Sequence, residues 1–325
     1  MSDWRPSASL ETLQLRARVL ARIRAFFDAR GVLEVETPVL SQAAASDPHI
    51  ESFITHNLAT GRADYLHTSP EFAMKRLLAS GSGSIYQLGK VFRRGEAGRR
   101  HNPEFTLLEW YRPGFDHHRL MDEVETLLQD VLAGYTTLAP ARRYSYAELF
   151  QTYAGFDPFN ADVDQLQTHV QQRGIDVTGL DGPAVDPWLD VVLTHEIEPA
   201  LAREGPVFVY DYPASQAALA QIRPGRADGA DRAERFELYV NGLELANGFH
   251  ELRDVAEQRQ RFEHDLAQRK AAGLDAVPLD ERLLQALQTG LPDCAGVALG
   301  VDRLVMLAAG VDSIADVLCF DYARA

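Results

Sequence analysis

The sequence predicts an α+β fold in which an antiparallel sheet is flanked by helices, and two observations support this prediction. Long strands pair with their sequence neighbours, and one pair meets at Asn241-Gly242, a strong signal for a tight hairpin. Amphipathic helices precede and follow these pairs, whereas a parallel sheet would alternate single strands with helices. We expect the 325 residues to form one large domain, residues 1–325.

The N-terminal part begins with a predicted helix over residues 13–30, which Gly31 ends. Apolar residues recur at helical spacing at Val19, Leu20, Ile23, Phe26 and Phe27. A strand is expected over residues 32–37, and it ends at Pro38 because proline has no backbone N–H to donate.

Two strands are predicted over residues 85–93 and 104–111, joined by a polar loop rich in glycine and arginine. An amphipathic helix follows, and Gly134 closes it. Its apolar face consists of Leu120, Met121, Val124, Leu127, Leu128, Val131 and Leu132. Residues 140–200 carry no clear pattern, and we expect a mixture of helix and loop there.

The C-terminal part adds a strand at Phe208–Tyr210 and a polar helix over residues 254–272. Over residues 295–309, a strand interrupted by glycine runs into a helix. The strands again pair locally, and the helices again lie outside the pairs, as the α+β prediction requires.

The composition disfavours two classes of function, extensive nucleic-acid binding and membrane association. The net charge of −15 disfavours extensive contact with a nucleic acid and favours a basic protein partner. No apolar run is long enough to span a bilayer, and the N-terminus lacks the apolar core of a signal peptide. We therefore expect a cytoplasmic protein without membrane contact. Cys294 and Cys319 show no metal-type spacing, and we expect structural roles for both.

The strand over residues 104–111 has a face suited to a ligand. Side chains alternate along a strand, so this face carries Phe105, Leu107, Glu109 and Tyr111. The face extends roughly 20 Å along the strand. Phe105 places an aromatic ring at one end, and Glu109 and Tyr111 place a carboxylate and a hydroxyl group at the other. The preceding loop forms a basic island of Arg94, Arg99, Arg100 and His101. A bound polyphosphate explains the island, a solvated basic loop is the alternative, and the loop alone does not decide between them.

The predicted hairpin carries two acids. A two-residue turn pairs Tyr239 with Glu244, and Glu237 with Ala246. The two carboxylates then lie on one face as diagonal neighbours, where they suit Mg²⁺ held against phosphate oxygens. From this segment alone, an ordinary solvent-exposed acidic face is the favoured alternative.

Beyond the hairpin, strict alternation would place Asn247, Phe249 and Glu251 on the face opposite to Glu244. These residues serve one site only if the strand carries a bulge between residues 244 and 248, which the glycine at 248 makes plausible. His250 is expected to be structural or exposed, because nothing in the sequence marks it as a metal ligand.

Glycines near the C-terminus form a further candidate site. Gly296 and Gly300 precede a helix and allow a ligand to approach closely, and Arg303 lies in the first helical turn. The alternative is a packing glycine with a surface arginine. Ser69-Pro70 is typical of a helix N-terminus, and the glycine–serine run at residues 81–84 reads as a connector, since it lacks the lysine of a phosphate loop.

From about residue 14 to the C-terminus, these segments together resemble the class II aminoacyl-tRNA synthetases, and specifically lysyl-tRNA synthetase. Gly31–Pro38 is similar to motif 1, Phe92–Glu109 to motif 2 and Gly300–Arg303 to motif 3. Glu244-x-x-Asn247-Gly248-Phe249-x-Glu251 adds a fourth match. The resemblance implies a class II catalytic fold in a single domain, residues 1–325, and a homodimer formed through motif 1.

The resemblance also implies roles at the matching positions. For ATP it implies Arg93, Arg94, Gly95, Glu96, His101, Asn102, Phe105, Glu244, Leu245, Gly300 and Arg303. For the amino acid it implies Ser69, Glu71, Glu109, Tyr111, Asn247, Phe249, Glu251 and Ala298. Mg²⁺ is implied at Glu237 and Glu244. Arg93 and Arg303 are the implied catalytic residues, with Arg93 on the α-phosphate and Arg303 sandwiching the adenine with Phe105.

The residue types fit the implied chemistry. A diamino acid has two ammonium groups, and the carboxylates of the implied pocket can pair with them. Its own carboxylate is ionised near pH 7, so attack on the α-phosphorus needs no general base. Catalysis then consists of positioning and charge neutralisation, which arginines and Mg²⁺ supply.

Three departures from lysyl-tRNA synthetase matter. Motif 1 begins almost at once, which leaves no room for the N-terminal anticodon-binding domain. Motif 2 reads Arg93-Arg94-Gly95-Glu96, so the glutamate that would read the adenine amino group is displaced by one position. Ala298 stands where lysyl enzymes carry glycine. We expect its methyl group to favour β-lysine over α-lysine, with simple packing as the alternative.

These departures are typical of the stand-alone paralogues that act as elongation factor P β-lysine ligases. The strings at Arg100–Phe105, Leu108–Arg112 and Pro213–Gln216 are similar to that subgroup. The resemblance implies that ATP activates (R)-β-lysine as its adenylate. Transfer then goes to a lysine side chain of elongation factor P, without stable tRNA binding.

Three alternatives remain. A truncated enzyme could still charge tRNA with lysine, although the acidic total disfavours this. A non-catalytic sensor of amino acid or nucleotide is disfavoured because it would not need the residues retained for ATP chemistry, which are Arg93, Glu237, Glu244 and Arg303. Amidation of aspartate is disfavoured because a pocket of carboxylates repels the second carboxylate of that substrate.

Overall fold

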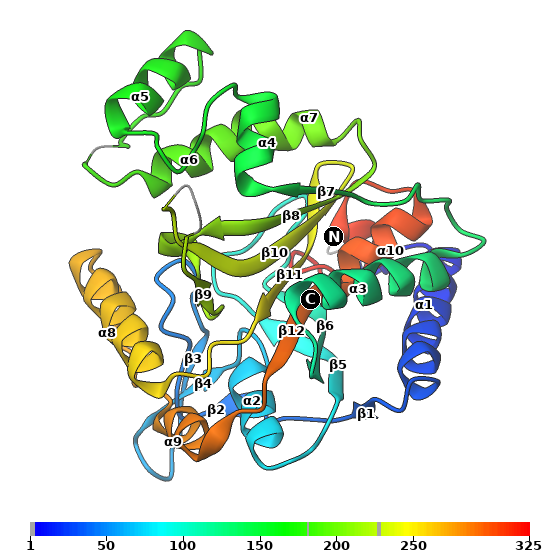
Figure 1. The fold of residues 1–325 in the computed structure, drawn as a ribbon. Coiled ribbons are helices and arrows are strands. Elements are labelled where there is room, and N and C mark those ends of the chain that lie inside the picture. Colours follow the sequence, from blue (N-terminus) through cyan, green and yellow to red (C-terminus); the bar gives the residue numbers. More distant parts are fainter. Residues whose placement is uncertain (1–3, 181, 226–228) are drawn as a thin grey trace. The chain divides into compact units, whose positions relative to one another are not determined.

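The computed structural model of the chain describes residues 4–180, 182–225 and 229–325. The chain divides into two compact units, drawn in Figure 1. Unit 1 comprises Met1–Phe115, Thr126–Thr137 and Arg253–Ala325, and unit 2 comprises Asp116–Glu125 and Leu138–Leu252. Compactness does not by itself make each unit an independent domain, so the single catalytic domain remains a prediction.

Unit 1 contains the two long strands that the sequence predicts. Its strands, in order, are β1 (Leu33–Glu34), β5 (Ile85–Phe92), β6 (Glu104–Pro113) and β12 (Cys294–Gly300). β6 pairs with β5 and β12 in antiparallel fashion, whereas β1 pairs with β5 in parallel. A small separate sheet orders β2 (Leu40–Ser41), β4 (Ala63–Leu66) and β3 (Ile54–His56).

The helices of unit 1 include those that the sequence predicts over residues 13–30, over residues 254–272 and at the end of residues 295–309. They are α1 (Leu10–Asp28), α2 (Glu71–Ala79), α8 (Val255–Ala271), α9 (Glu281–Gly290), α10 (Val301–Ala309) and the 3-10 helix η3 (Ile314–Val317). Of these, α9 and η3 were not predicted. α1 begins at Ser9, whose side chain accepts a hydrogen bond from Thr12 N, and Gly31 follows its end with φ +63°. α10 packs against β6 and α1, which places the motif 3 segment beside the motif 2 strand.

The apolar stripe of α1 is covered within the chain. Val19, Ile23, Phe26 and Phe27 are almost wholly buried, and Phe27 stacks on Tyr86 of β5 at 4.4 Å between ring centroids. The stripe is therefore covered without a second copy of the chain, and the homodimer expected from motif 1 does not depend on it. The contacts come from strands distant in sequence, which helical periodicity cannot reveal.

Unit 2 contains a second set of strands. Its strands, in order, are β7 (Arg142–Ser145), β8 (Pro206–Pro213), β10 (Arg232–Val240) and β11 (Leu243–His250), with β9 (Ile222–Arg223) paired to β10. β7 and β8 are parallel, and the other pairs are antiparallel. The fold is therefore α+β, as predicted, but the strand pairing is mixed and only mostly antiparallel.

The segment without a clear sequence pattern folds into short helices. These are α4 (Tyr146–Tyr153), α5 (Val163–Gln172), α6 (Asp186–Val192), the π-helix η1 (Leu193–Ile197) and α7 (Glu198–Leu201), and the 3-10 helix η2 (Ala214–Gln216) follows β8. α4 packs on β8, and an aromatic cluster around Tyr146, Phe150 and Tyr212 joins them. The helix α3 (His117–Leu132) begins in unit 2 and continues into unit 1.

The β10–β11 hairpin has a register that the sequence did not predict completely. Asn241 and Gly242 adopt φ +54° and +70°, as a type I′ turn requires, and Tyr239 pairs with Glu244 as expected. A β-bulge then shifts the register, so that Glu237 pairs with Asn247 and not with Ala246. A bulge adds one residue on one strand, which regular alternation cannot predict.

The predicted strand over residues 32–37 is also shorter than expected. Only Leu33 and Glu34 form β1, although Val35 N still donates to Tyr86 O at 2.8 Å. Thr37 N donates instead to the side chain of Gln87 at 2.8 Å, so the backbone leaves the ladder before Pro38. Among the described residues, no helix combines the length and apolar character needed to cross a membrane.

Candidate functional site

Arg93 and Phe105 form the first part of the candidate site, in unit 1. Arg93 directly follows β5 and Phe105 lies on β6, and the guanidinium carbon is 5.1 Å from the ring centroid. The backbone N–H of Arg93 donates to Pro103 O at 2.9 Å, and its side chain lies 3.6 Å from Glu96. An aromatic face beside a guanidinium can hold a base and a phosphate of one nucleotide.

Arg303 joins this group through His101. Gly300 begins α10, Arg303 lies in the first turn, and its guanidinium donates to His101 Nε2 at 2.8 Å. Partial burial, together with the Arg303 cation, lowers the pKa of His101 below its ordinary value. The imidazole therefore stays neutral near pH 7 and accepts the hydrogen bond that orients Arg303.

Glu109 lies at the centre of a second group in unit 1. It is 2% exposed and accepts hydrogen bonds from Ser69 Oγ and Tyr111 Oη, each at 2.7 Å. Glu109 pairs across β6 and β12 with Ala298. Four residues predicted to bind the amino acid are thus brought together, and the buried carboxylate is suited to an ammonium ligand.

Glu71 is tied to the same group by its backbone. Its N–H donates to Ser69 Oγ at 3.0 Å, so the serine hydroxyl links the start of α2 to Glu109. The Glu71 carboxylate itself accepts a hydrogen bond from the buried Lys75 ammonium at 2.6 Å. A substrate ammonium at Glu71 would therefore share this carboxylate with Lys75.

Other predicted ATP-binding residues have structural partners. Arg94 forms an ion pair with Glu51 at 2.7 Å, and Glu51 forms a second ion pair with Arg269 at 2.8 Å. The Asn102 amide donates to Glu104 O at 2.6 Å and accepts from Tyr322 N at 2.9 Å. Both of these side chains hold the motif 2 loop in place, so an ATP contact from either would add to this role.

The predicted residues of unit 2 share one face of β11. Because of the bulge at Leu245, Glu244 pairs with Tyr239, Asn247 with Glu237, and Phe249 with Arg235. Opposed residues point to the same side of an antiparallel pair. The bulge that the sequence interpretation requires between residues 244 and 248 is therefore present, and it lies at Leu245.

Glu237 is buried in a network that the sequence did not reveal. Its Oε2 accepts from Tyr212 Oη at 2.8 Å and Tyr239 Oη at 2.6 Å, and its Oε1 accepts from Arg235. Burial, and next the Glu237 charge, raise the pKa of both phenols, so they remain protonated donors. Both oxygens of Glu237 are thus engaged, and Mg²⁺ binding there would have to displace a donor.

Arg235 extends this network to the face that carries Asn247. Its guanidinium donates to Asn247 Oδ1 at 3.3 Å and to Gln216 O at 2.7 Å, and it bonds to Glu237. Neither Arg235 nor Tyr212 was predicted from the sequence. The available signal was an arginine two positions before Glu237, which places both on one strand face.

Comparisons with known proteins agree with the motif pattern. A family model described as tRNA synthetases class II (D, K and N) matches residues 1–324. The "Elongation factor P--(R)-beta-lysine ligase" of Salmonella gallinarum is 51% identical over 328 residues, covering 100% of this chain and 99% of that protein. Proteins of the same name from Salmonella paratyphi B and Salmonella heidelberg are 50% identical over the same lengths.

Proposed function

Because the chain belongs to the class II tRNA synthetases (D, K and N), we propose that it activates (R)-β-lysine with ATP and transfers it to elongation factor P. The acceptor is a lysine side chain of that factor. Relatives named "Elongation factor P--(R)-beta-lysine ligase" match the chain over its whole length at about 50% identity. The structural observation that carries the proposal is the buried Glu109, held by Ser69 and Tyr111, because it suits a cationic substrate.

In the first step, an oxygen of the substrate carboxylate bonds to the α-phosphorus of ATP, and pyrophosphate leaves. Arg93 and Arg303 neutralise the charge on the reacting phosphate, and Phe105 supports the adenine. The ionised carboxylate is already the nucleophile near pH 7, so no side chain has to remove a proton. The two ammonium groups of the substrate pair with carboxylates, among which we assign Glu109 and Glu251.

In the second step, the neutral amine of a lysine of elongation factor P attacks the adenylate carbonyl. An amide bond forms, AMP leaves, and the amine loses a proton to water. Bound Mg²⁺ would neutralise phosphate charge, and carboxylates are the oxygen ligands it prefers. We assign Glu244 as its protein ligand, with Glu237 in a supporting role because its oxygens already accept three donors.

We propose a homodimer, with the motif 1 segment and the two residues that follow it, Val39 and Leu40, as its contact surface. Leu33, Val39 and Leu40 are 56%, 39% and 49% exposed, which is unusual for large apolar side chains close together in sequence. A second copy would cover them. We also propose that the protein acts in the cytoplasm and that it forms no stable complex with tRNA.

The test is pyrophosphate exchange with a panel of diamino acids, followed by transfer of labelled product. Exchange should be fastest with (R)-β-lysine, and the label should pass to elongation factor P and not to total tRNA. Label on tRNA alone would identify a truncated tRNA-charging enzyme instead. Absence of exchange with every diamino acid would favour a non-catalytic sensor.

A further inference from the structure

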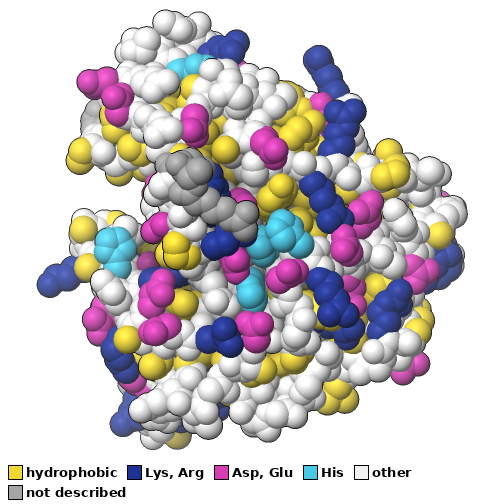
Figure 2. All heavy atoms as spheres, in the orientation of Figure 1, with side chains coloured by type: hydrophobic (Ala, Val, Ile, Leu, Met, Phe, Trp, Pro, Cys, Tyr) yellow, Lys and Arg dark blue, Asp and Glu magenta, His cyan; other side chains and the backbone are white. Residues whose placement is uncertain are grey.

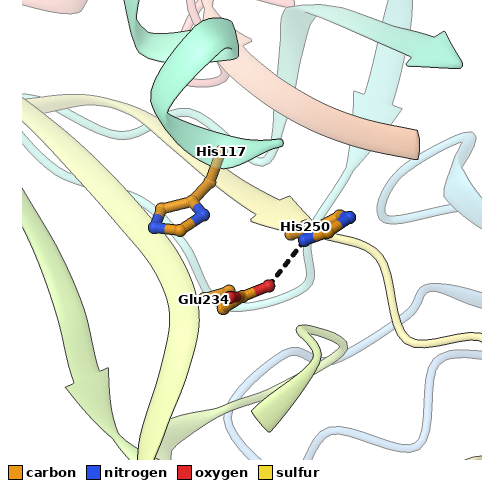
Figure 3. A group of neighbouring side chains, drawn as sticks. All are labelled: His117, Glu234 and His250. Carbon is orange, nitrogen blue, oxygen red and sulfur yellow. Dashed lines mark hydrogen bonds and ion pairs between the residues drawn. The ribbon is translucent and has the colours of Figure 1, made fainter. Parts of the chain in front are cut away.

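A group of two imidazoles and a carboxylate lies in unit 2, apart from the residues assigned above. His117 is the first residue of α3, Glu234 lies on β10 and His250 is the last residue of β11. One potential ligand atom of each lies within 4.8 Å of the others. Figure 3 shows the three side chains facing a common point. We propose that they bind a divalent transition-metal ion, for which zinc is the natural probe.

His117 is the strongest indication of a ligand. Its side chain is only 2% exposed, yet within the described parts of the chain neither ring nitrogen has a hydrogen-bond partner. Buried imidazoles normally have a partner for each ring nitrogen that can bond. In Figure 3, one nitrogen of this ring faces His250 and Glu234, as a metal ligand would.

Asp211 is placed to orient this imidazole. Its Oδ1 lies 3.6 Å from His117 Nε2, and Arg223 holds the other oxygen at 2.6 Å. Histidines that bind metals commonly donate their second ring N–H to a carboxylate. Nε2 of His117 therefore faces Asp211, which leaves Nδ1 for the metal.

Glu234 and His250 already form a close pair. Glu234 Oε2 and His250 Nδ1 are 2.5 Å apart, and Arg223 lies 3.8 Å from Glu234 Oε1. Two ligands of a tetrahedral zinc ion lie about 3.3 Å apart, given metal–ligand distances of about 2.0–2.1 Å. Small side-chain rotations would therefore suffice to bring the three ligand atoms to that spacing.

The chemistry of the ligands selects the ion. Imidazole nitrogens suit zinc and other first-row transition metals, whereas Mg²⁺ prefers oxygen ligands. Glu234 and Asp211 carry two negative charges beside the site, and Arg223, which contacts both carboxylates, offsets one of them. Three protein ligands leave a fourth position for water.

The site lies on a different strand face from the proposed substrate residues. His250 alternates with Phe249 and Glu251, so its side chain leaves β11 on the opposite side. Figure 2 shows imidazole groups gathered at one place on the surface, beside carboxylates and basic side chains. Zinc there would tie the start of α3 to the ends of β10 and β11 without taking part in adenylate formation.

The test is zinc binding by the tag-free full-length protein, stripped with a chelator and titrated in excess Mg²⁺ without ATP. We expect about one equivalent of Zn²⁺, a higher melting temperature with zinc, and visible absorption bands when Co²⁺ replaces it. His117→Ala and His250→Ala should each lower the affinity for zinc by at least about a hundredfold. Asp211→Asn should lower it by roughly ten- to a hundredfold.

The matched control is His169→Ala. It removes an imidazole from another histidine–glutamate pair of unit 2, in which His169 Nε2 lies 2.7 Å from Glu196, and it should leave zinc affinity unchanged. Less than a tenth of an equivalent in the wild-type protein would overturn the proposal. Zinc affinity that stays as high in both alanine variants as in the wild-type protein would also overturn it. Should these variants fail to fold, Asp211→Asn decides, since unaltered zinc affinity there would contradict the proposed geometry.

Discussion

Glu109 and Ala298 lie directly opposite each other in the antiparallel pair of β6 and β12. Side chains so placed have Cβ atoms about 4.5–5.5 Å apart and share one face of the sheet. The alanine methyl group is therefore a neighbour of the carboxylate that we assign to a substrate ammonium. A single methyl group in a packed site is worth about 1–3 kcal/mol of discrimination.

We predict that Ala298→Gly raises activity with α-lysine relative to β-lysine by roughly tenfold, because it removes that methyl group. The measurement is the ratio of kcat/KM values for the two isomers in pyrophosphate exchange. The control is Ala295→Gly on the same strand, which pairs with Arg112. If the ratio does not move, Ala298 serves packing alone and another residue selects the isomer.

Glu109→Gln should raise the KM for β-lysine roughly ten- to hundredfold, since loss of a charged hydrogen bond costs about 1.5–3 kcal/mol. The KM for ATP should change less than about twofold on the same reasoning. Glu251→Gln should behave in the same way. The control is Glu104→Gln, an exposed acid on the same strand as Glu109. An unchanged amino-acid KM would remove these residues from the pocket.

Arg303→Ala and Glu244→Ala should each abolish adenylate formation. The first removes a cation beside His101, and the second removes the carboxylate that we assign to Mg²⁺. Pyrophosphate exchange measures both, with Arg259→Ala as the control because Arg259 forms an exposed pair with Glu281. Near-normal exchange in either variant would refute the role assigned to that residue.

Glu237→Gln distinguishes a supporting role from metal binding. It leaves the Arg235 cation, which is 17% exposed, without its carboxylate, and loss of one partner of a buried ion pair costs up to about 3–5 kcal/mol. We expect a clearly lower melting temperature with an unchanged half-saturating Mg²⁺ concentration in pyrophosphate exchange. The opposite pattern would make Glu237 a metal ligand: a normal melting temperature with a half-saturating Mg²⁺ concentration raised about tenfold. Such an increase corresponds to a loss of about 1.4 kcal/mol in binding free energy.

Leu40→Glu should convert the proposed dimer into a monomer, because a charge would enter an apolar contact surface. Sedimentation at micromolar concentration measures this change. Leu58→Glu is the control, since Leu58 is 99% exposed and lies outside the proposed contact surface of residues 31–40. A wild-type protein that sediments as a monomer would contradict the dimer itself.

Much of the local structure followed from the sequence. The strands at Ile85–Phe92 and Glu104–Pro113 and the turn at Asn241-Gly242 depend on neighbours in the chain, so alternation and turn chemistry predicted them. Local sequence also predicted the helix α10, which carries Arg303 in its first turn. Residue types within these elements also carried the family resemblance, which the family model later matched.

Tertiary structure decided which of these residues meet. One extra residue at Leu245 brings Asn247 and Phe249 to the face of Glu244, and a bulge leaves no mark in the alternation pattern before it. Glu237 obtains its partner Tyr212 from a different strand. His117 and His250, far apart in the chain, approach only because α3 begins beside β11. Periodicity records the environment of each residue along its own element, whereas such contacts depend on how separate elements pack.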